Sequence, residues 1–160
     1  MLDSTQRHRI DTHKNLVGFI VGEVHYAIDI SRVREIVNPL PITALPHMPS
    51  DVAGVADHRG EVVPVLDLRV RFNLAPKDDA RGTKWILITL ENQVVGLVVD
   101  SVTEVFGAQN DDIRPTPEVG GNGDLRGIMG VARHEGRLTF VLDTARFIDV
   151  VEALSASGAI

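Results

Sequence analysis

Apolar and polar residues alternate with a period of two along much of the chain, which predicts β-strands. Val24, Tyr26, Ile28 and Ile30 are apolar, and the residues between them are mostly polar. Gly22–Glu23 separates this run from the apolar run before it, as in a β-hairpin turn. The chain is therefore expected to open with a hairpin whose second strand is half-buried.

A second hairpin is predicted further along, where the runs WILITL (85–90) and VVGLVVD (94–100) flank the polar segment 91–93. Helical spacing of apolar residues appears only near the end of the chain, at Phe147, Ile148, Val151 and Leu154. This spacing predicts a short C-terminal amphipathic helix.

One segment repeats within the chain. GVADHRGEVVPVLDL (54–68) and GVARHEGRLTFVLDT (130–144) are identical at eight of fifteen positions. The preceding segments also align, with Glu35 on Glu104 and Ile36 on Val105. Each half therefore contains a hairpin, a Val-x-Glu segment, a glycine turn and a strand ending in Asp. We expect two mostly-β lobes around one shared core, lobe 1 over about 15–76 and lobe 2 over about 83–150.

The local structure of residues 30–37 and the place of Pro64 in its sheet are less clearly predicted, and both ends of the chain are expected to be flexible. Residues 30–37 fit either a short helical turn capped by Ser31 or the start of a strand. Pro64 lies within a predicted strand and favours an edge strand or a bulge. Residues 1–13 are expected to form a flexible arm, 14–154 a single domain, and 155–160 a flexible tail.

Composition excludes several classes of protein. The 160 residues carry a formal net charge of −6, which argues against general binding to nucleic acid. Cysteine is absent, which excludes disulfides and zinc–thiolate sites. No segment approaches the roughly 20 apolar residues that span a bilayer, so we expect a cytoplasmic protein without membrane insertion.

The sequence contains almost no arrangement of residues that is typical of a catalytic site. Asp67 and Asp143 end equivalent strands and could form an aspartic-hydrolase dyad, but neither copy has the glycine that such a motif needs after Asp-Thr. Asp100 ends a predicted strand, as the phosphoacceptor Asp of a receiver domain does. The chain lacks the alternating strands and long helices that such a domain needs. None of the six histidines has the helical spacing of a zinc site, and no phosphate-binding glycine loop precedes a helix. We expect neither an enzyme nor a bound cofactor or metal.

Charged residues beside the turns therefore remain as the candidates for a functional site. Glu35 and Arg59 each lie beside a turn within otherwise apolar sequence. They are either a solvated pair of little energetic weight or a pair that faces each other and presents fixed charge to a partner.

The motifs YAIDISRVREIV, GVADHRGEVVPVLDLRVRF, VVGLVVDSVTEV, IRPTP and GIMGVARHEGRLTFVLD together resemble the CheW family of chemotaxis coupling proteins. The resemblance covers about residues 16–149. It implies two five-stranded, SH3-like β-barrels related by pseudo-twofold symmetry around a common core. It also implies a non-catalytic adaptor that binds the regulatory domain of a CheA-type histidine kinase and the cytoplasmic tip of methyl-accepting receptors.

Several positions match functional positions of that family. The resemblance implies partner binding by Val33 and Glu35 of the V-x-E segment, by Gly54 and Arg59 of the central motif, and by Val98 and Val99 in a lobe-2 strand expected to line the groove. Asp57 and His58 replace the usual Asn-Leu, which adds one negative charge and one titratable ring to a partner-binding turn.

The pathway stays open at this level. An adaptor of gliding or pilus motility is the main alternative to a flagellar system, and Asp57-His58 is the feature that would reflect a different receptor. Self-association, the identity of the receptor and the exchange of strands between lobes are likewise not decided by the sequence.

Overall fold

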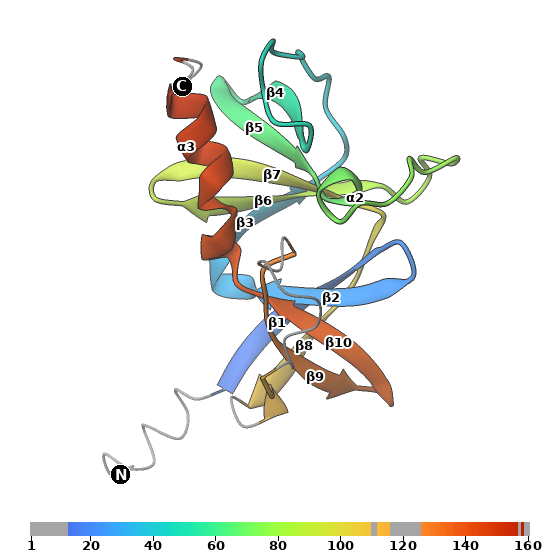
Figure 1. Cartoon of the computed structure of the whole chain (residues 1–160). Helices are drawn as coiled ribbons and strands as arrows, with labels where there is room; N and C mark the ends of the chain where they lie inside the picture. Colours follow the sequence, from blue (N-terminus) through green and yellow to red (C-terminus); the bar gives the residue numbers. More distant parts are fainter. Residues whose placement is uncertain (1–12, 110–111, 116–125, 157, 159–160) are drawn as a thin grey trace.

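The computed structural model describes residues 13–109, 112–115, 126–156 and 158. Its strands form two five-stranded sheets that lie one above the other in Figure 1. We call the upper one the middle barrel. In sheet order it contains β3 (Val33–Val37), β6 (Lys84–Leu90), β7 (Gln93–Val99), β5 (Glu61–Asp67) and β4 (Val52–His58).

The lower sheet, which we call the terminal barrel, is built from both ends of the chain. In sheet order it contains β8 (Ser101–Gln109), β1 (His13–Val21), β2 (Val24–Asp29), β10 (Arg137–Leu142) and β9 (Ile128–His134). Each barrel has one parallel pair, β5 with β7 and β10 with β2, and its other neighbours are antiparallel. The two barrels therefore have the same topology. In sheet order, β8, β1, β2, β10 and β9 of the terminal barrel are equivalent to β3, β6, β7, β5 and β4 of the middle barrel.

The barrels do not coincide with the two halves of the sequence. The first hairpin, β1–β2, pairs with β8 and β10 of the second half, and the second hairpin, β6–β7, pairs with β3 and β5 of the first half. The expected lobes 15–76 and 83–150 are therefore wrong as structural units. The repeat is real, but its two copies exchange their hairpins.

A shared hydrophobic core lies between the barrels, as predicted. Phe19, Tyr26 and Ile28 of the terminal barrel and Ile86 and Leu97 of the middle barrel belong to one buried cluster. Smaller clusters fill the interior of each barrel. Strands with one face in the shared core and one in their own barrel must be apolar on both faces. This is why WILI and VVGLVV are nearly continuous apolar runs.

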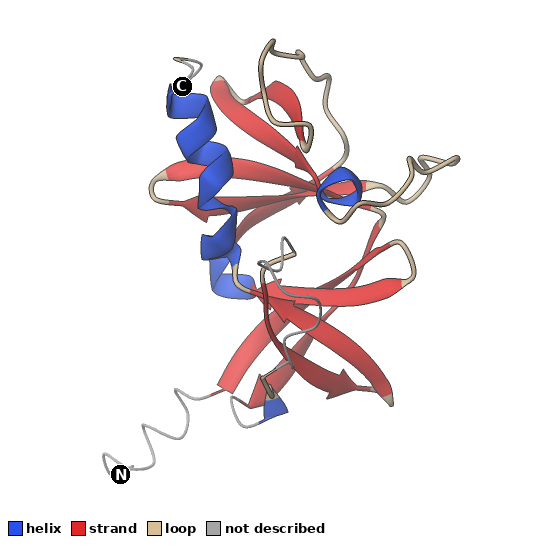
Figure 2. Ribbon diagram, viewed as in Figure 1, coloured by secondary structure: helices blue, strands red, loops and turns tan. Residues whose placement is uncertain are grey.

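Short helices cover one side of the junction (Figure 2). The 3₁₀ helix η3 (Thr144–Phe147) leads into α3 (Ile148–Ala156), and Phe147, Val150 and Leu154 are buried in the shared core. The predicted C-terminal helix is confirmed, and it includes residues 155–156 that were expected in the tail. None of the described helices is both long and apolar enough to cross a membrane.

Other local expectations have mixed outcomes. A 3₁₀ turn, η1 (Ile30–Arg32), precedes β3, and its cap is Asp29 rather than Ser31. Pro64 lies in β5, which is an inner strand, so the edge prediction is wrong. The ladder between β5 and β7 begins at Val65, so Pro64 lies beyond its end and its missing N–H breaks no pair there. His13 starts β1, and the rest of the expected arm lies outside the described residues.

A partly buried ionic junction joins the barrels where the chain passes from β7 to β8. Asp100 accepts two hydrogen bonds from Arg69 of α2 (Leu68–Arg71), at 2.8 and 2.9 Å, and one from the Gly22 amide at 2.7 Å. Burial by itself would raise the pKa of Asp100. The hydrogen bonds from Arg69 and Gly22, with the charges of Arg69 and Lys77, outweigh burial and hold that pKa below its ordinary value.

Stability should therefore fall in acid partly through Asp100. Because its folded-state pKa is lowered, its contribution is complete above the unfolded value of about 3.9 and is lost as the pH falls through the folded value. We expect the free energy of unfolding of Asp100→Asn, measured by urea titration, to depend less on pH below about 4 than that of the wild type. Identical slopes in the two proteins would contradict this role.

Candidate partner-binding surface

The two edge strands of the middle barrel are joined by a charged cluster that we call the Glu35 corner. Glu35 lies on β3, His58 ends β4, and Arg59 follows in the β4–β5 turn. Glu35 Oε2 is 3.0 Å from His58 Nε2, and Glu35 Oε1 accepts a 3.0 Å hydrogen bond from Arg59 Nη2. Glu35 and Arg59 thus face each other, as one of the two alternatives had it, and their role toward a partner stays a prediction. His58 was not expected to share the same carboxylate.

Local turn chemistry places Arg59 at this corner. Arg59 and Gly60 both have positive φ, 54° and 80°, which is the pattern of a type I′ hairpin turn. Asp57 Oδ1 accepts a 2.8 Å hydrogen bond from the Gly60 amide and stabilises the turn. Arg59 therefore extends outward with a side chain that is 76% exposed.

The electrostatics keep Glu35 ionised. The hydrogen bond with His58 lowers the pKa of Glu35 most; partial burial opposes this, and the charges of Arg59, His58 and Arg34 lower it further. Arg34 of β3 also pairs with Glu61 of β5 at 3.2 Å. The corner thus presents a fixed carboxylate with a cation beside it at neutral pH.

Apolar residues flank these charges. Ile36 follows Glu35 and Val62 follows Glu61, and both are exposed at 40% and 48%. Val33 is half-buried and packs against the shared core. An exposed mixture of aliphatic and fixed charged groups is chemically suited to a specific protein contact. It offers no nucleophile positioned beside a base.

Membership of a family follows from comparison with known proteins. The family model described as the CheW-like domain matches residues 15–152, nearly the whole chain. The chain belongs to the CheW family. Proteins of the CheW family are non-catalytic scaffolding adaptors of chemotaxis, and this CheW-family chain shares that class.

Individual relatives agree with this assignment. Chemotaxis protein CheW of Helicobacter pylori is 34% identical over 79% of this chain and 76% of its own length. Protein FrzA of Myxococcus xanthus is 35% identical over 74% of this chain and 73% of its own length. The crystal structure of the scaffolding protein TtCheW from Thermoanaerobacter tengcongensis superposes with a TM-score of 0.74 at 30% identity, covering 81% of this chain and 88% of that one.

Three residues assigned to partner binding from the CheW resemblance lie in structural positions. Gly54 is buried, and a Cβ built on it would lie 2.2 Å from the Thr43 carbonyl oxygen. Val99 is buried, and Val98 is half-buried against the interior of the middle barrel. Both valines belong to β7 of the middle barrel, so their expected place in a lobe-2 strand is wrong.

The two aspartates of the hydrolase alternative have structural roles in this CheW-family fold. Asp67 accepts a 3.0 Å hydrogen bond from the Arg69 amide and caps α2. Asp143 accepts a 3.1 Å bond from the Ala145 amide and caps η3. Each carboxylate caps the short helix that follows its strand, and the two strands belong to different barrels. The dyad hypothesis is therefore wrong.

Sequence reasoning missed a second corner in the terminal barrel. Glu104 of β8 and His134 at the end of β9 form a 2.8 Å contact between Oε1 and Nε2, equivalent to that of Glu35 and His58. The signal was present, because Glu35 aligns with Glu104 and His58 with His134 in the internal repeat. Neither half of the alignment showed that the two residues meet across the edges of one barrel.

Proposed function

We propose that this CheW-family protein couples methyl-accepting chemotaxis receptors to a CheA-type histidine kinase in the cytoplasm. The Glu35 corner is the observation that carries the proposal. A half-buried carboxylate held by His58 and Arg59 on the outer edge of a barrel is an ordered, charged contact point, and the strands around it carry exposed aliphatic residues. The Helicobacter pylori relative named above is a chemotaxis protein and TtCheW is a scaffolding protein, which supports such partners.

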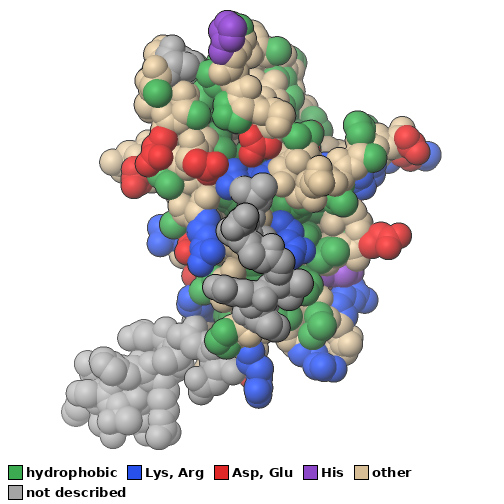
Figure 3. All heavy atoms as spheres, in the orientation of Figure 1, with side chains coloured by type: hydrophobic (Ala, Val, Ile, Leu, Met, Phe, Trp, Pro, Cys, Tyr) green, Lys and Arg blue, Asp and Glu red, His purple; other side chains and the backbone are tan. Residues whose placement is uncertain are grey.

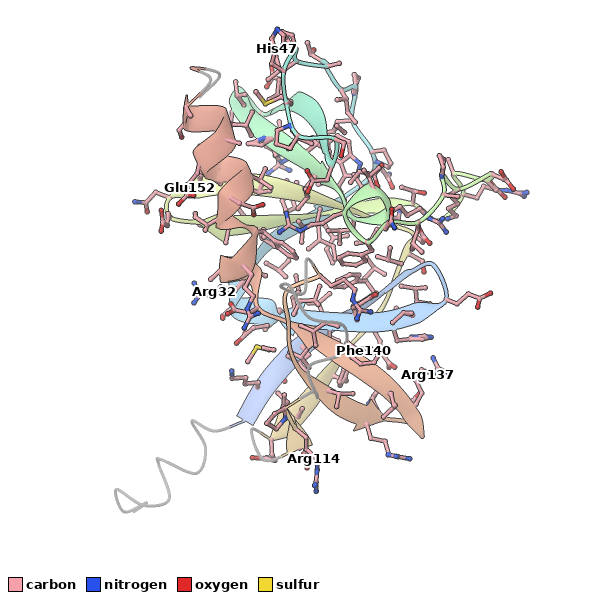
Figure 4. The ribbon with its side chains drawn as sticks, viewed as in Figure 1. Arg32, His47, Arg114, Arg137, Phe140 and Glu152 are labelled. Carbon is pink, nitrogen blue, oxygen red and sulfur yellow. The ribbon has the colours of Figure 1, made fainter. Side chains whose placement is uncertain are left out.

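Two separate contacts are proposed. The kinase regulatory domain docks on the middle barrel near Val33, Glu35 and the turn that carries Asp57, His58 and Arg59. The receptor tip, a helical hairpin, lies in the groove between the barrels. A hollow of about 140 Å³ at the barrel junction has room for one side chain of such a tip, and it is lined by Arg32, the end of β6 with the turn after it, η3 and Ile148. Arg32 lies beside this junction in Figure 4.

Charge differs between the two barrels on the face shown in Figure 3. Acidic side chains gather toward the α3 side of the middle barrel, and most Lys and Arg side chains lie toward the terminal barrel. The two barrels have one topology, so this difference supports distinct partners for similar shapes.

Arg59→Glu is expected to weaken receptor coupling without unfolding the protein. Because Arg59 is exposed and its pair with Glu35 is at the surface, its loss should cost under about 1 kcal/mol of stability. A second carboxylate beside Glu35 reverses the charge offered to the kinase, so we expect on the order of tenfold weaker kinase binding and, through it, weaker receptor control of the kinase. The measurement is receptor-dependent kinase autophosphorylation in membranes reconstituted with receptor, kinase and this protein.

Arg81→Glu is the matched control, because Arg81 is 91% exposed in the 75–83 connection and the substitution makes the same change in charge. Pull-downs with the isolated kinase and with the receptor tip show which contact is affected. The assigned role of Arg59 is wrong if Arg59→Glu unfolds, or if it binds both partners as the wild type does.

A CheW-like adaptor of a gliding or pilus pathway is the second candidate. FrzA and a chemotaxis CheW match this chain at nearly the same identity, so sequence identity does not separate the pathways. Pull-downs against all CheA-type kinases of the same genome would distinguish them, because the partner kinase identifies the pathway.

A further inference from the structure

The terminal barrel carries three potential metal ligands at the position equivalent to the Glu35 corner. We call Glu104, His134 and Glu135 the Glu135 corner. It lies at the β9–β10 turn, at the lower end of the terminal barrel in Figure 1. One ligand atom from each residue lies within 4.8 Å of the others. His134 Nε2 is 2.8 Å from Glu104 Oε1 and 4.0 Å from Glu135 Oε1.

The two corners have the same turn conformation, but the first residue of the turn is Arg59 in one and Glu135 in the other. Glu135 and Gly136 have φ of 51° and 75°, nearly those of Arg59 and Gly60. Arg59 therefore neutralises Glu35 in one corner, whereas Glu135 adds a second carboxylate in the other. The ion pairs found in the described part of the chain bring no Lys or Arg to Glu104 or Glu135. The Glu135 corner is thus an imidazole beside two anions.

The imidazole is held in place before any ligand arrives. Phe106 stacks on His134 with ring centroids 3.9 Å apart and an interplanar angle of 13°. This contact fixes the plane of the ring while Nε2 faces the carboxylates. The ring is only partly buried, so a hydrated ion has access to Nε2. Positioned ligands lose less freedom on binding, which favours affinity.

Donor spacing suits a small divalent transition metal. Zinc binds imidazole nitrogen at about 2.0–2.1 Å and carboxylate oxygen at about 2.0–2.2 Å, which places tetrahedral donors about 3.3 Å apart. The present separations of 2.8 and 4.0 Å lie on either side of that value, and rotation of the exposed Glu135 side chain changes the longer one. Metal binding at Nε2 requires the neutral tautomer that carries its hydrogen on Nδ1, so a hydrogen on Nε2 is given up to solvent while Nδ1 takes one from solvent, with no net change in protons.

We propose that the Glu135 corner binds a divalent transition metal ion of the zinc type through Glu104, His134 and Glu135, with solvent completing its coordination. The ion links edge strand β8 to the β9–β10 turn, as Arg59 and Glu35 link the corresponding elements of the middle barrel. It also neutralises the pair of carboxylates and so changes the charge of this end of the terminal barrel.

The test is calorimetric titration of the tag-free, chelator-treated full chain with Zn²⁺, with Co²⁺ absorption as a second readout of coordination. We expect saturable binding with one site that depends on this corner. His134→Gln and Glu135→Arg should each weaken that site at least tenfold. Arginine is tolerated at this turn position, because Arg59 occupies the equivalent position with nearly the same φ. His47→Gln is the control for a surface histidine elsewhere.

A reciprocal variant makes the test sharper. Arg59→Glu in the His134→Gln background gives the middle barrel the same three ligand types, with Glu35 and His58 in place. We expect this double variant to regain a Zn²⁺ site that His134→Gln alone lacks. The proposal is overturned if no binding occurs up to about 1 mM Zn²⁺. It is equally overturned if His134→Gln and Glu135→Arg bind Zn²⁺ as tightly as the wild type.

Discussion

Gly54→Ala is expected to destabilise the protein by on the order of 3–5 kcal/mol, a large effect for the addition of one methyl group. The segment after β3 crosses over β4 at this point, where Thr43 and Val55 exchange backbone hydrogen bonds of 2.8 and 2.9 Å. A methyl group on Gly54 would lie 2.2 Å from the Thr43 carbonyl oxygen, which is part of that backbone and cannot rotate away. The residue also has a φ of 144°, which side chains rarely adopt.

Two other glycines provide graded controls. Gly130 occupies the equivalent crossing in the terminal barrel, and its added Cβ would lie 2.8 Å from the Arg114 carbonyl oxygen, so we expect a smaller loss. Gly60 has positive φ but nothing within 4 Å, so Gly60→Ala should cost only about 1 kcal/mol. Urea unfolding measures all three. If Gly54→Ala is as stable as Gly60→Ala, the crossing does not constrain the fold.

This prediction also separates two roles of Gly54. The CheW resemblance implied partner binding by Gly54, whereas its position implies close passage of two backbones. If Gly54→Ala keeps native stability but loses a partner, the binding role is supported. If stability falls first, weaker binding follows from unfolding.

Arg69→Met is expected to cost about 2–4 kcal/mol, because it leaves Asp100 without its cation at a side chain that is only 12% exposed. Arg69 also donates a 2.6 Å hydrogen bond to the Ala75 carbonyl, so the loss extends into the 75–83 connection. Asp100 joins the last residue of β7 to the first of β8, and Arg69 therefore supports the passage between barrels.

An exposed ion pair serves as the control for Arg69→Met. Arg81 and Asp79 form a 2.8 Å pair with highly exposed side chains, and Arg81→Met should change stability by less than about 0.5 kcal/mol. The double variant Arg69→Met with Asp100→Asn should recover part of the loss, because it removes the unpaired charge. Equal effects at Arg69 and Arg81 in thermal and urea unfolding would show that the junction adds no stability.

The two copies of the internal repeat share their backbone geometry and differ in the charge of one turn residue. Equivalent glycines shape equivalent crossings and turns, and equivalent Glu–His contacts join the edge strands of each barrel. Arg59 and Glu135 then give the two corners opposite charge. Duplication of this kind supplies one scaffold twice, and single substitutions at exposed turn positions give each copy a different charge.

The sequence by itself determined the strands, the hairpins, the repeat, the C-terminal helix and the absence of a catalytic motif. These depend on local periodicity, on turn residues such as Gly22 and Gly60, and on residue types, all of which are visible along the chain. The sequence also singled out Glu35 and Arg59 as charges beside turns, but it left open whether they face each other.

Only the tertiary structure decided which barrel each hairpin joins, and that the edge strands carrying each corner meet. The two hairpins align with each other in the internal repeat, so local pattern cannot choose between pairing with β3 and pairing with β8. The connection decides: a single residue, Asp100, separates β7 from β8. This connection carries β8 out of the middle barrel and into the terminal barrel, where it pairs with β1 rather than with β6 of its own half. That path brings Glu104 to His134, residues that the sequence keeps far apart.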